Sequence, residues 1–533
     1  MELSISRAAM ASAVLWLGTA GPGGAQHTDH QPILGKVEFK VSCTPQAQKH
    51  FNLAMSYYHS YAWTYISEPI DQVLAADPSC AMAHWLRSLA ALDNAFSWPI
   101  PLTPKAFVAG SETLEKARQA DFKTQRERDY VDALAVFYKD RETVPHRTRA
   151  LAFEQAMGEV AKRYPEDSEA SILHALLVSA TFDPTDKAFK NQLRAAAILE
   201  PIFREQPEHP GAAHYLIHTY DYPAIAAKGL DAARNYAKIA PSAPHALHMP
   251  SHIFTRVGAW QDSVESNRAS AKSAAPGDYS AAHAYDYMVY AHAQMAQDQA
   301  SAQVLAQMRA MKPVDHPAYS FAAAAVPARV ALERGDWAQA ARVELNPPAD
   351  AFPWQKYPQS EAMNAFARGI GAAMANDLTA ARAQVERLEA LKGASKIPYW
   401  AEQIGIQAEV VRGLALAADS KVQEALVVLN KAADREDATE KNVVTPGPLV
   451  PAREVLAQVL LADGKASEAL QAFEAVMKRE PYRYRTIAGA AQAAEKAGDR
   501  TRSIRYYADL AKLTRDADTV RPEIARARQV IMR

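Results

Sequence analysis

The sequence predicts an all-α protein whose helical hairpins stack into a solenoid. Three observations predict this class. Strand-like alternation of apolar and polar residues is scarce, alanine-rich amphipathic stretches recur, and these stretches are broken at Gly-Asp or Asn-Asp and end at Asp-Pro or Glu-Pro. Apolar residues at helical spacing, separated by such turns, are typical of paired helices. Because one pair cannot bury its apolar face alone, neighbouring pairs are expected to stack into a superhelix.

The clearest unit covers residues 454–481, with a first helix, a turn at Gly464, a second helix and a closing Pro481. The next unit has its turn glycine at Gly498, 34 residues after Gly464. The same pattern is found at 332–345, 373–388 and, more loosely, 417–433. The array is expected to begin near residues 48–90, where Asp77-Pro78 closes the first unit and Pro69 departs from the pattern because it would kink the second helix.

These units resemble tetratricopeptide repeats, which share the mid-unit glycine, the small residue of the second helix and the closing proline. The resemblance implies that the first helix of each pair lines a concave surface. The stretches "DPSCAMAHW", "HPGAAHYLIHTYD", "HALHMPSHIFTRVGAW" and "DATEKNVVTPGPLVPARE" are similar to a group of exported bacterial tetratricopeptide proteins. This resemblance implies fold and export, and it implies no reaction.

Composition excludes some classes of function. Hydrophobic residues make up 49% of the chain and charged residues 22%, as in ordinary globular proteins. Lys plus Arg number 59 against 60 for Asp plus Glu, without a basic cluster, so a nucleic-acid partner is not expected. After the N-terminal region, no apolar run is long enough to span a membrane.

The N-terminus predicts export to the periplasm or secretion. Arg7 precedes the apolar run "AAMASAVLWLGTA" and the small residues "GPGGA", as in a signal peptide of residues 1–25. Residues 26–42 are expected to form a flexible leader. The solenoid then covers 43–533, with histidine-rich repeats at about 208–292 and regular repeats at about 320–515. In an oxidising compartment the two cysteines, Cys43 and Cys80, favour a disulfide, and two unpaired buried thiols are the alternative.

The histidines of the central repeats are in register with one another. His248 and His252 in "HMPSH" lie 34 residues after His214 and His218 in "HYLIH". Spacing of i, i+4 places both rings of a pair on one helix face, and packed helices lie roughly 8–10 Å apart. With Gly258 as the turn glycine, these positions face the concave groove of the tetratricopeptide family. Four imidazoles from adjacent helices are therefore predicted to bind one ion.

Further side chains are candidates for the same site. Asp221 is expected on the same face, as a ligand or as the partner that fixes an imidazole tautomer. His245 and His283 are additional candidate ligands, although the repeat register slips near His283. Pro250 either kinks the helix that carries His248 and His252 or starts it, and in the second case His245 and His248 lie in the preceding loop.

Two functions from different classes follow. Imidazole ligands suit zinc, copper, iron or nickel rather than calcium or magnesium, so the first is an exported transition-metal protein whose ion either does chemistry or is only stored. The second is a non-enzymatic scaffold that binds a small molecule or peptide in a polar, histidine-lined groove. Simple packing of the histidines is the third interpretation. No phosphate-binding loop, Gly-x-Ser-x-Gly or Cys-x-x-Cys motif is found, so the sequence predicts no catalytic residue.

Overall fold

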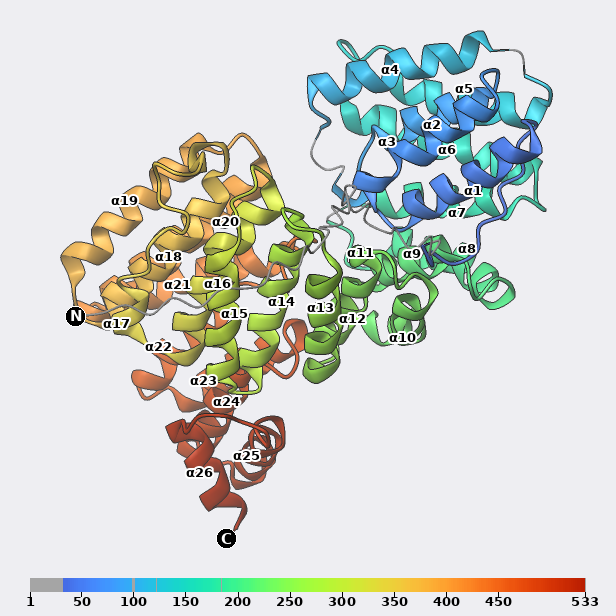
Figure 1. The fold of residues 1–533 in the computed structure, drawn as a ribbon. Coiled ribbons are helices and arrows are strands. Elements are labelled where there is room, and N and C mark those ends of the chain that lie inside the picture. The colour runs from blue at the N-terminus through green and yellow to red at the C-terminus, as the bar shows by residue number, and fades with distance from the viewer. Residues whose placement is uncertain (1–31, 98–100, 121, 184, 533) are drawn as a thin grey trace, which may run out of the picture. The chain divides into compact units, whose positions relative to one another are not determined.

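The computed structural model describes residues 32–532 except 98–100, 121 and 184 (Figure 1). The predicted signal peptide (1–25) and residues 26–31 of the predicted leader lie outside the described residues. In the described part there are α-helices, four short 3-10 helices and no strand. The first half contains α1 (Pro45–His59), η1 (Trp63–Tyr65), α2 (Ser67–Ala76), α3 (Ala81–Ala90), η2 (Ala95–Ser97), α4 (Pro104–Gln119), α5 (Gln125–Tyr138), α6 (His146–Arg163), α7 (Ser168–Ala180), α8 (Lys190–Glu205), α9 (Pro210–Tyr220), η3 (Ala226–Gly229), α10 (Leu230–Ile239), α11 (Pro244–His248), α12 (Pro250–Arg256) and α13 (Trp260–Ser273).

The second half has the same kind of element. Its helices are α14 (Tyr279–Gln294), α15 (Asp298–Ala310), α16 (Pro317–Arg334), α17 (Trp337–Ala340), η4 (Trp354–Lys356), α18 (Pro358–Met374), α19 (Leu378–Ala394), α20 (Pro398–Ala418), α21 (Val422–Ala438), α22 (Ala452–Ala462), α23 (Ala466–Arg479), α24 (Tyr484–Lys496), α25 (Arg500–Leu513) and α26 (Pro522–Ile531).

Local sequence explains where many of these helices begin and end. Thr44, Thr124 and Asp167 each accept a hydrogen bond from the backbone N–H three residues later, which satisfies a free donor at a helix start. The predicted turn glycines Gly464 and Gly498 have φ angles of 81° and 77°, in the left-handed region that favours glycine. The hairpin turns are therefore specified where the sequence predicts them.

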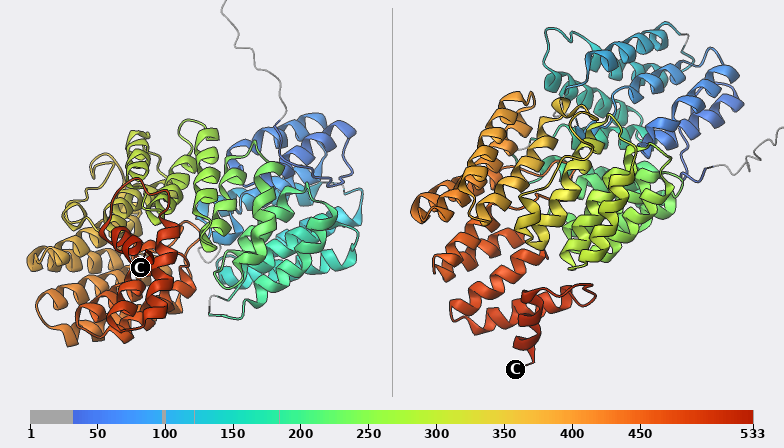
Figure 2. Two further views of the ribbon diagram at one scale, coloured as in Figure 1. Left: turned by 90° about the horizontal axis from the view of Figure 1, so that it is seen from below. Right: turned by 60° about the vertical axis from the view of Figure 1, so that its left-hand side comes forward.

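Helices pack as consecutive hairpins, which confirms the predicted fold class (Figures 1 and 2). In the second half the alternate helices α14, α16, α18, α20, α22 and α24 contact one another in series, and each also packs on the helices that precede and follow it in the chain. α24 also contacts α14, the first helix of this row. The row therefore curves back on itself.

Two large apolar cores hold the helices together. One is formed by residues between 34 and 254 and the other by residues between 282 and 527. The later part of the histidine-rich sequence closes the first core, at α11 and α12, and opens the second, at α14. The predicted metal-binding region thus lies at the junction of the two cores.

The segment before α1 is packed along the part that the structure describes. Leu34, Val37 and Phe39 are buried, and the Lys36 backbone N–H donates to the Glu208 carbonyl oxygen at 2.9 Å. Residues 33–42 thus differ from the flexible leader that the sequence predicts, because their apolar side chains fill the first core. The predicted disulfide is confirmed, since Cys43 and Cys80 are bonded with their Cα atoms 5.4 Å apart.

Pro250 divides one helical segment into two. α11 ends at His248 and α12 begins at Pro250, while Met249 between them keeps helical dihedral angles of φ −53° and ψ −36°. The chain thus continues in nearly the same direction through a one-residue break.

Among the described helices, none combines the length and apolar character needed to cross a membrane.

Candidate metal centre

The first histidine group combines α9 and α11. It consists of His214, His218 and His245, whose ligand atoms all lie within 4.8 Å of one another. The His214 Nδ1–H donates to the backbone oxygen of His59 at 2.6 Å, so its unprotonated Nε2 faces His245 Nε2 at 3.1 Å. His218 is buried, and neither of its ring nitrogens has a hydrogen-bond partner among the described residues. A buried imidazole without partners is costly unless another ligand takes its lone pair.

Aromatic rings fix this group in place. The Phe96 ring stacks on His218 with ring centroids 4.0 Å apart, and Tyr236 stacks on His214 at 5.2 Å. Rings held in this way lose little further freedom when they bind an ion.

The second group combines α11 and α12, which lie on either side of the Pro250 break, with α14. It consists of His248, His252 and His283, again with ligand atoms within 4.8 Å of one another. The His248 Nδ1–H donates to Asn267 Oδ1 at 2.6 Å, and Asn267 Nδ2 donates to the Ser263 carbonyl oxygen at 2.7 Å, which fixes the orientation of the amide. The helix break therefore does not separate His248 from His252.

His252, the partner of His248 in the i, i+4 pair, is oriented by a carboxylate. The His252 Nδ1–H donates to Asp221 Oδ2 at 2.9 Å. The Nε2 atoms of His248 and His252 then face each other at 3.0 Å. Because both rings are neutral and carry their proton on Nδ1, neither Nε2 atom has a hydrogen to donate to the other. Two nitrogens bound tetrahedrally to one zinc ion, with bonds of about 2.0–2.1 Å, lie about 3.3 Å apart, close to the observed separation.

The histidines are held in the neutral form that binds metals. Burial is the largest cause that lowers the pKa of His214, His218, His245, His248 and His283 well below the ordinary value, and neighbouring histidines lower it further. Burial also lowers the pKa of His252, although Asp221 opposes that shift. No proton therefore has to leave an imidazole at neutral pH when an ion binds.

Asp221 orients the centre and stays outside both groups. Burial would raise its pKa, but Lys441 and Arg256 hold the pKa well below the ordinary value, so the carboxylate is ionised. Its Oδ1 accepts from Arg256 Nε at 2.9 Å, and its Oδ2 accepts from Lys441 Nζ at 2.8 Å. Of the two roles that the sequence allows, the structure supports fixing the His252 tautomer.

Lys441 and Asn267 are not among the residues that the sequence predicts for this centre. Lys441 lies in the 439–451 segment between α21 and α22, more than 200 residues from Asp221 in the sequence. Burial lowers its pKa to about 8, while Asp221 opposes the shift. A segment between repeats has no periodic register, so its partner could not be inferred from spacing.

The four predicted ligands are divided differently from the single site that the sequence predicts. His214 and His218 join His245, whereas His248 and His252 join His283. The physical reason is that a third ring on a neighbouring segment lies within 4.8 Å of both ligand atoms of each i, i+4 pair and completes a set of three nitrogens. His245 and His283, expected only as additional ligands, complete the two groups.

A third buried cluster has a different hydrogen-bonding pattern. Glu169 accepts from His59 Nε2 at 2.9 Å and from His209 Nε2 at 3.0 Å. The other nitrogens of these rings accept hydrogen bonds, His59 Nδ1 from the Tyr215 hydroxyl and His209 Nδ1 from the Ala212 N–H. Every ring nitrogen is satisfied without an ion. This cluster therefore stabilises the fold, and its His59 carbonyl orients His214.

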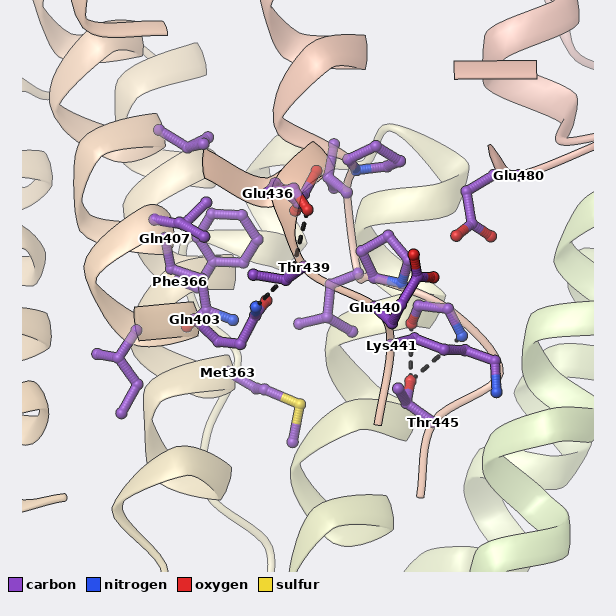
Figure 3. Close-up of a pocket in the computed structure, with 18 of the residues that line it drawn as sticks. Met363, Phe366, Gln403, Gln407, Glu436, Thr439, Glu440, Lys441, Thr445 and Glu480 are labelled. Carbon is purple, nitrogen blue, oxygen red and sulfur yellow. Dashed lines mark hydrogen bonds between the residues drawn. The ribbon is translucent and has the colours of Figure 1, made fainter. Parts of the chain in front are cut away.

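A cavity of about 110 Å³ lies beside the row of alternate helices in the second half (Figure 3). One wall carries Met363, Phe366, Gln403 and Gln407, from α18 and α20, and the facing wall carries Glu440, Lys441 and Thr445. Lys441 thus lines the cavity and also contacts Asp221 beside the histidines. The 439–451 segment connects the two features.

Comparisons with known proteins bear on the fold of the chain. No family model matches the sequence, and no curated protein matches it. Solved structures with a similar fold include yeast Tom70 (12% identity, 91% of this chain and 89% of that chain, TM-score 0.30) and human IFIT1, solved as a dimer with m7Gppp-AAAA (11%, 82% and 90%, TM-score 0.37). The TPR domain of P58(IPK) is similar over 85% of this chain and 98% of its own, at 12% identity and a TM-score of 0.21. The chain is an all-helical repeat protein.

Proposed function

We propose that this chain is a transition-metal-binding repeat protein, in which the triad His214, His218 and His245 binds one ion and the triad His248, His252 and His283 binds another. The observation that carries the proposal is the direction of the ring nitrogens. In His214, His248 and His252 the Nδ1–H donates outward, to His59, Asn267 and Asp221, and Nε2 is left facing a second imidazole. Outward hydrogen bonds of this kind are typical of metal-binding histidines.

The donor set favours zinc, copper or iron. All six proposed ligands are neutral imidazoles, whereas calcium and magnesium prefer oxygen ligands. Three protein ligands leave a coordination position open, as in catalytic zinc sites rather than closed structural ones. This feature favours a centre that binds an exogenous ligand over one that only strengthens the fold.

We place the protein in the periplasm or outside the cell. The predicted signal peptide of residues 1–25 motivates this location, and the Cys43–Cys80 disulfide supports it because disulfides persist in oxidising compartments. N-terminal sequencing of protein from the periplasm of the expressing bacterium tests it. A chain that keeps residues 1–25 and remains in the cytoplasm would contradict it.

Metal analysis of untagged protein tests the function. Wild-type protein is stripped with a chelator, reloaded with zinc or copper, desalted and measured by mass spectrometry. We expect two ions per chain, one ion after His218→Ala or His283→Ala, and none after both changes. His50→Ala alters a partly buried histidine of α1 outside all three groups and is expected to keep two ions. A wild-type chain that retains no ion under any loading condition would rule the proposal out.

The cavity favours a second candidate function, binding of a small organic molecule or a peptide segment. Met363 and Phe366 offer apolar surface, and the Gln407 Oε1 atom is buried without a hydrogen-bond partner among the described residues. Fluorescence of N-phenyl-1-naphthylamine, an apolar probe, is expected to rise with metal-free protein and to lose that rise after Met363→Glu. An equal response of the variant would exclude this cavity as the binding site.

A further inference from the structure

The two triads lie next to each other. The rings of His218 and His252, from different triads, have centroids 5.7 Å apart, and those of His245 and His248 are 6.1 Å apart. Within a triad, ring centroids are separated by as little as 4.4 Å, for His248 and His283, and by as much as 6.4 Å, for His252 and His283. The spacing between the triads thus falls within the spacing inside them.

The protein provides little negative charge for two ions at this place. The proposed ligands are neutral, and both cysteines are used in the disulfide. The Asp221 carboxylate, which accepts a hydrogen bond from His252, already contacts the two cations Arg256 and Lys441. Two divalent ions would add four positive charges to a largely buried site, which is costly without a compensating anion.

Each triad also has one less buried member. His245 and His283 are partly exposed, whereas the other four histidines are buried. Each triad therefore has one residue at a partly solvent-exposed edge.

We propose that the two triads form one dinuclear centre whose ions share a small inorganic anion taken from solvent, such as hydroxide. The anion occupies the open positions that the three-histidine ligand sets leave, and it supplies the negative charge that the protein does not. This inference rests on the proposed function, because it requires an ion in each triad. Two-metal centres with a shared ligand are an established means of activating water.

Copper(II) is a suitable probe because a shared anion couples the unpaired electrons of two copper ions and weakens their paramagnetic resonance signal. The protein is stripped and loaded with copper(II), copper is counted by mass spectrometry, and spins are counted by resonance spectroscopy with and without azide. We expect two copper ions per chain, far fewer than two spins, and an azide-dependent absorption band. His283→Ala should leave one copper ion, and that ion should give one full spin.

His218→Ala repeats the test from the other triad, and His50→Ala is the matched control that should behave as the wild type. Circular dichroism of each metal-free variant shows whether it is folded. Two copper ions that give two full spins, with a resonance signal and an absorption spectrum unchanged by azide, would overturn the proposal of a shared anion. The proposed function would still stand. A single ion in the wild type would overturn the dinuclear centre, and no ion would remove the proposed function as well.

Discussion

The Nε2 atoms of His248 and His252 face each other at 3.0 Å, and the Nδ1 atom of each ring is turned away toward an oxygen acceptor. The ring nitrogens of the third cluster, formed by His59, His209 and Glu169, are arranged differently. Glu169 lies between His59 and His209 there and accepts a hydrogen bond from each. Proximity of histidines alone thus does not define a metal site, whereas the direction of their lone pairs separates two candidate sites from one hydrogen-bonded cluster.

Removing the acceptor of His248 should weaken one triad. Asn267→Leu keeps a similar volume but leaves the His248 ring without the partner that fixes its tautomer. We expect metal affinity at this triad to fall about 10–100-fold. Competition with a coloured chelator in the His218→Ala background measures that triad alone. Gln261→Ala, an exposed change on the same helix, is the control, and equal affinities for the two variants would contradict the assigned role.

Asp221→Asn should destabilise the metal-free protein. The carboxylate compensates Arg256 and Lys441, and a buried ion pair that loses one partner typically costs about 3–5 kcal/mol. Urea unfolding measures the change. Adding Lys441→Met should recover part of the loss, because it removes one of the uncompensated cations. If the double variant is no more stable than Asp221→Asn, Lys441 does not depend on this carboxylate.

Much of the fold follows from the sequence, because it depends on local periodicity. The 34-residue spacing between Gly464 and Gly498 places two hairpin turns, and the same spacing identifies both histidine pairs. The division into triads could not be predicted. It depends on which third ring each pair meets after the chain has folded. The contact of Lys441 with Asp221 could not be predicted either, because Lys441 lies in a segment between repeats.

Glu436 should make stability depend on pH. Burial raises its pKa from the ordinary 4.5 to about 8, so the folded state favours the protonated acid. The stabilisation from this group is fully present below pH 4.5 and is lost as the pH rises through 8. Relative to Glu436→Gln, the free energy of unfolding of the wild type should fall by roughly 3 kcal/mol between pH 5 and 8. Urea unfolding of metal-free protein across this range measures it, and parallel pH profiles would contradict the shift.

The Cys43–Cys80 bond should stabilise the N-terminal core. Its removal in Cys43→Ser/Cys80→Ser frees a loop with a sequence separation of 37 residues, and disulfides of this kind contribute about 2–4 kcal/mol. Chemical unfolding of the variant against the oxidised wild type checks the value. Metal content is expected to stay at two ions per chain, because neither cysteine belongs to a triad.

Anomalous X-ray diffraction from crystals of the metal-loaded protein, measured at the absorption edge of the bound metal, tests the central claim most directly. The account predicts two neighbouring peaks, one among His214, His218 and His245 and the other among His248, His252 and His283, each at about 2 Å from ring nitrogens. Crystals that contain the metal but show no peak at either triad would contradict it.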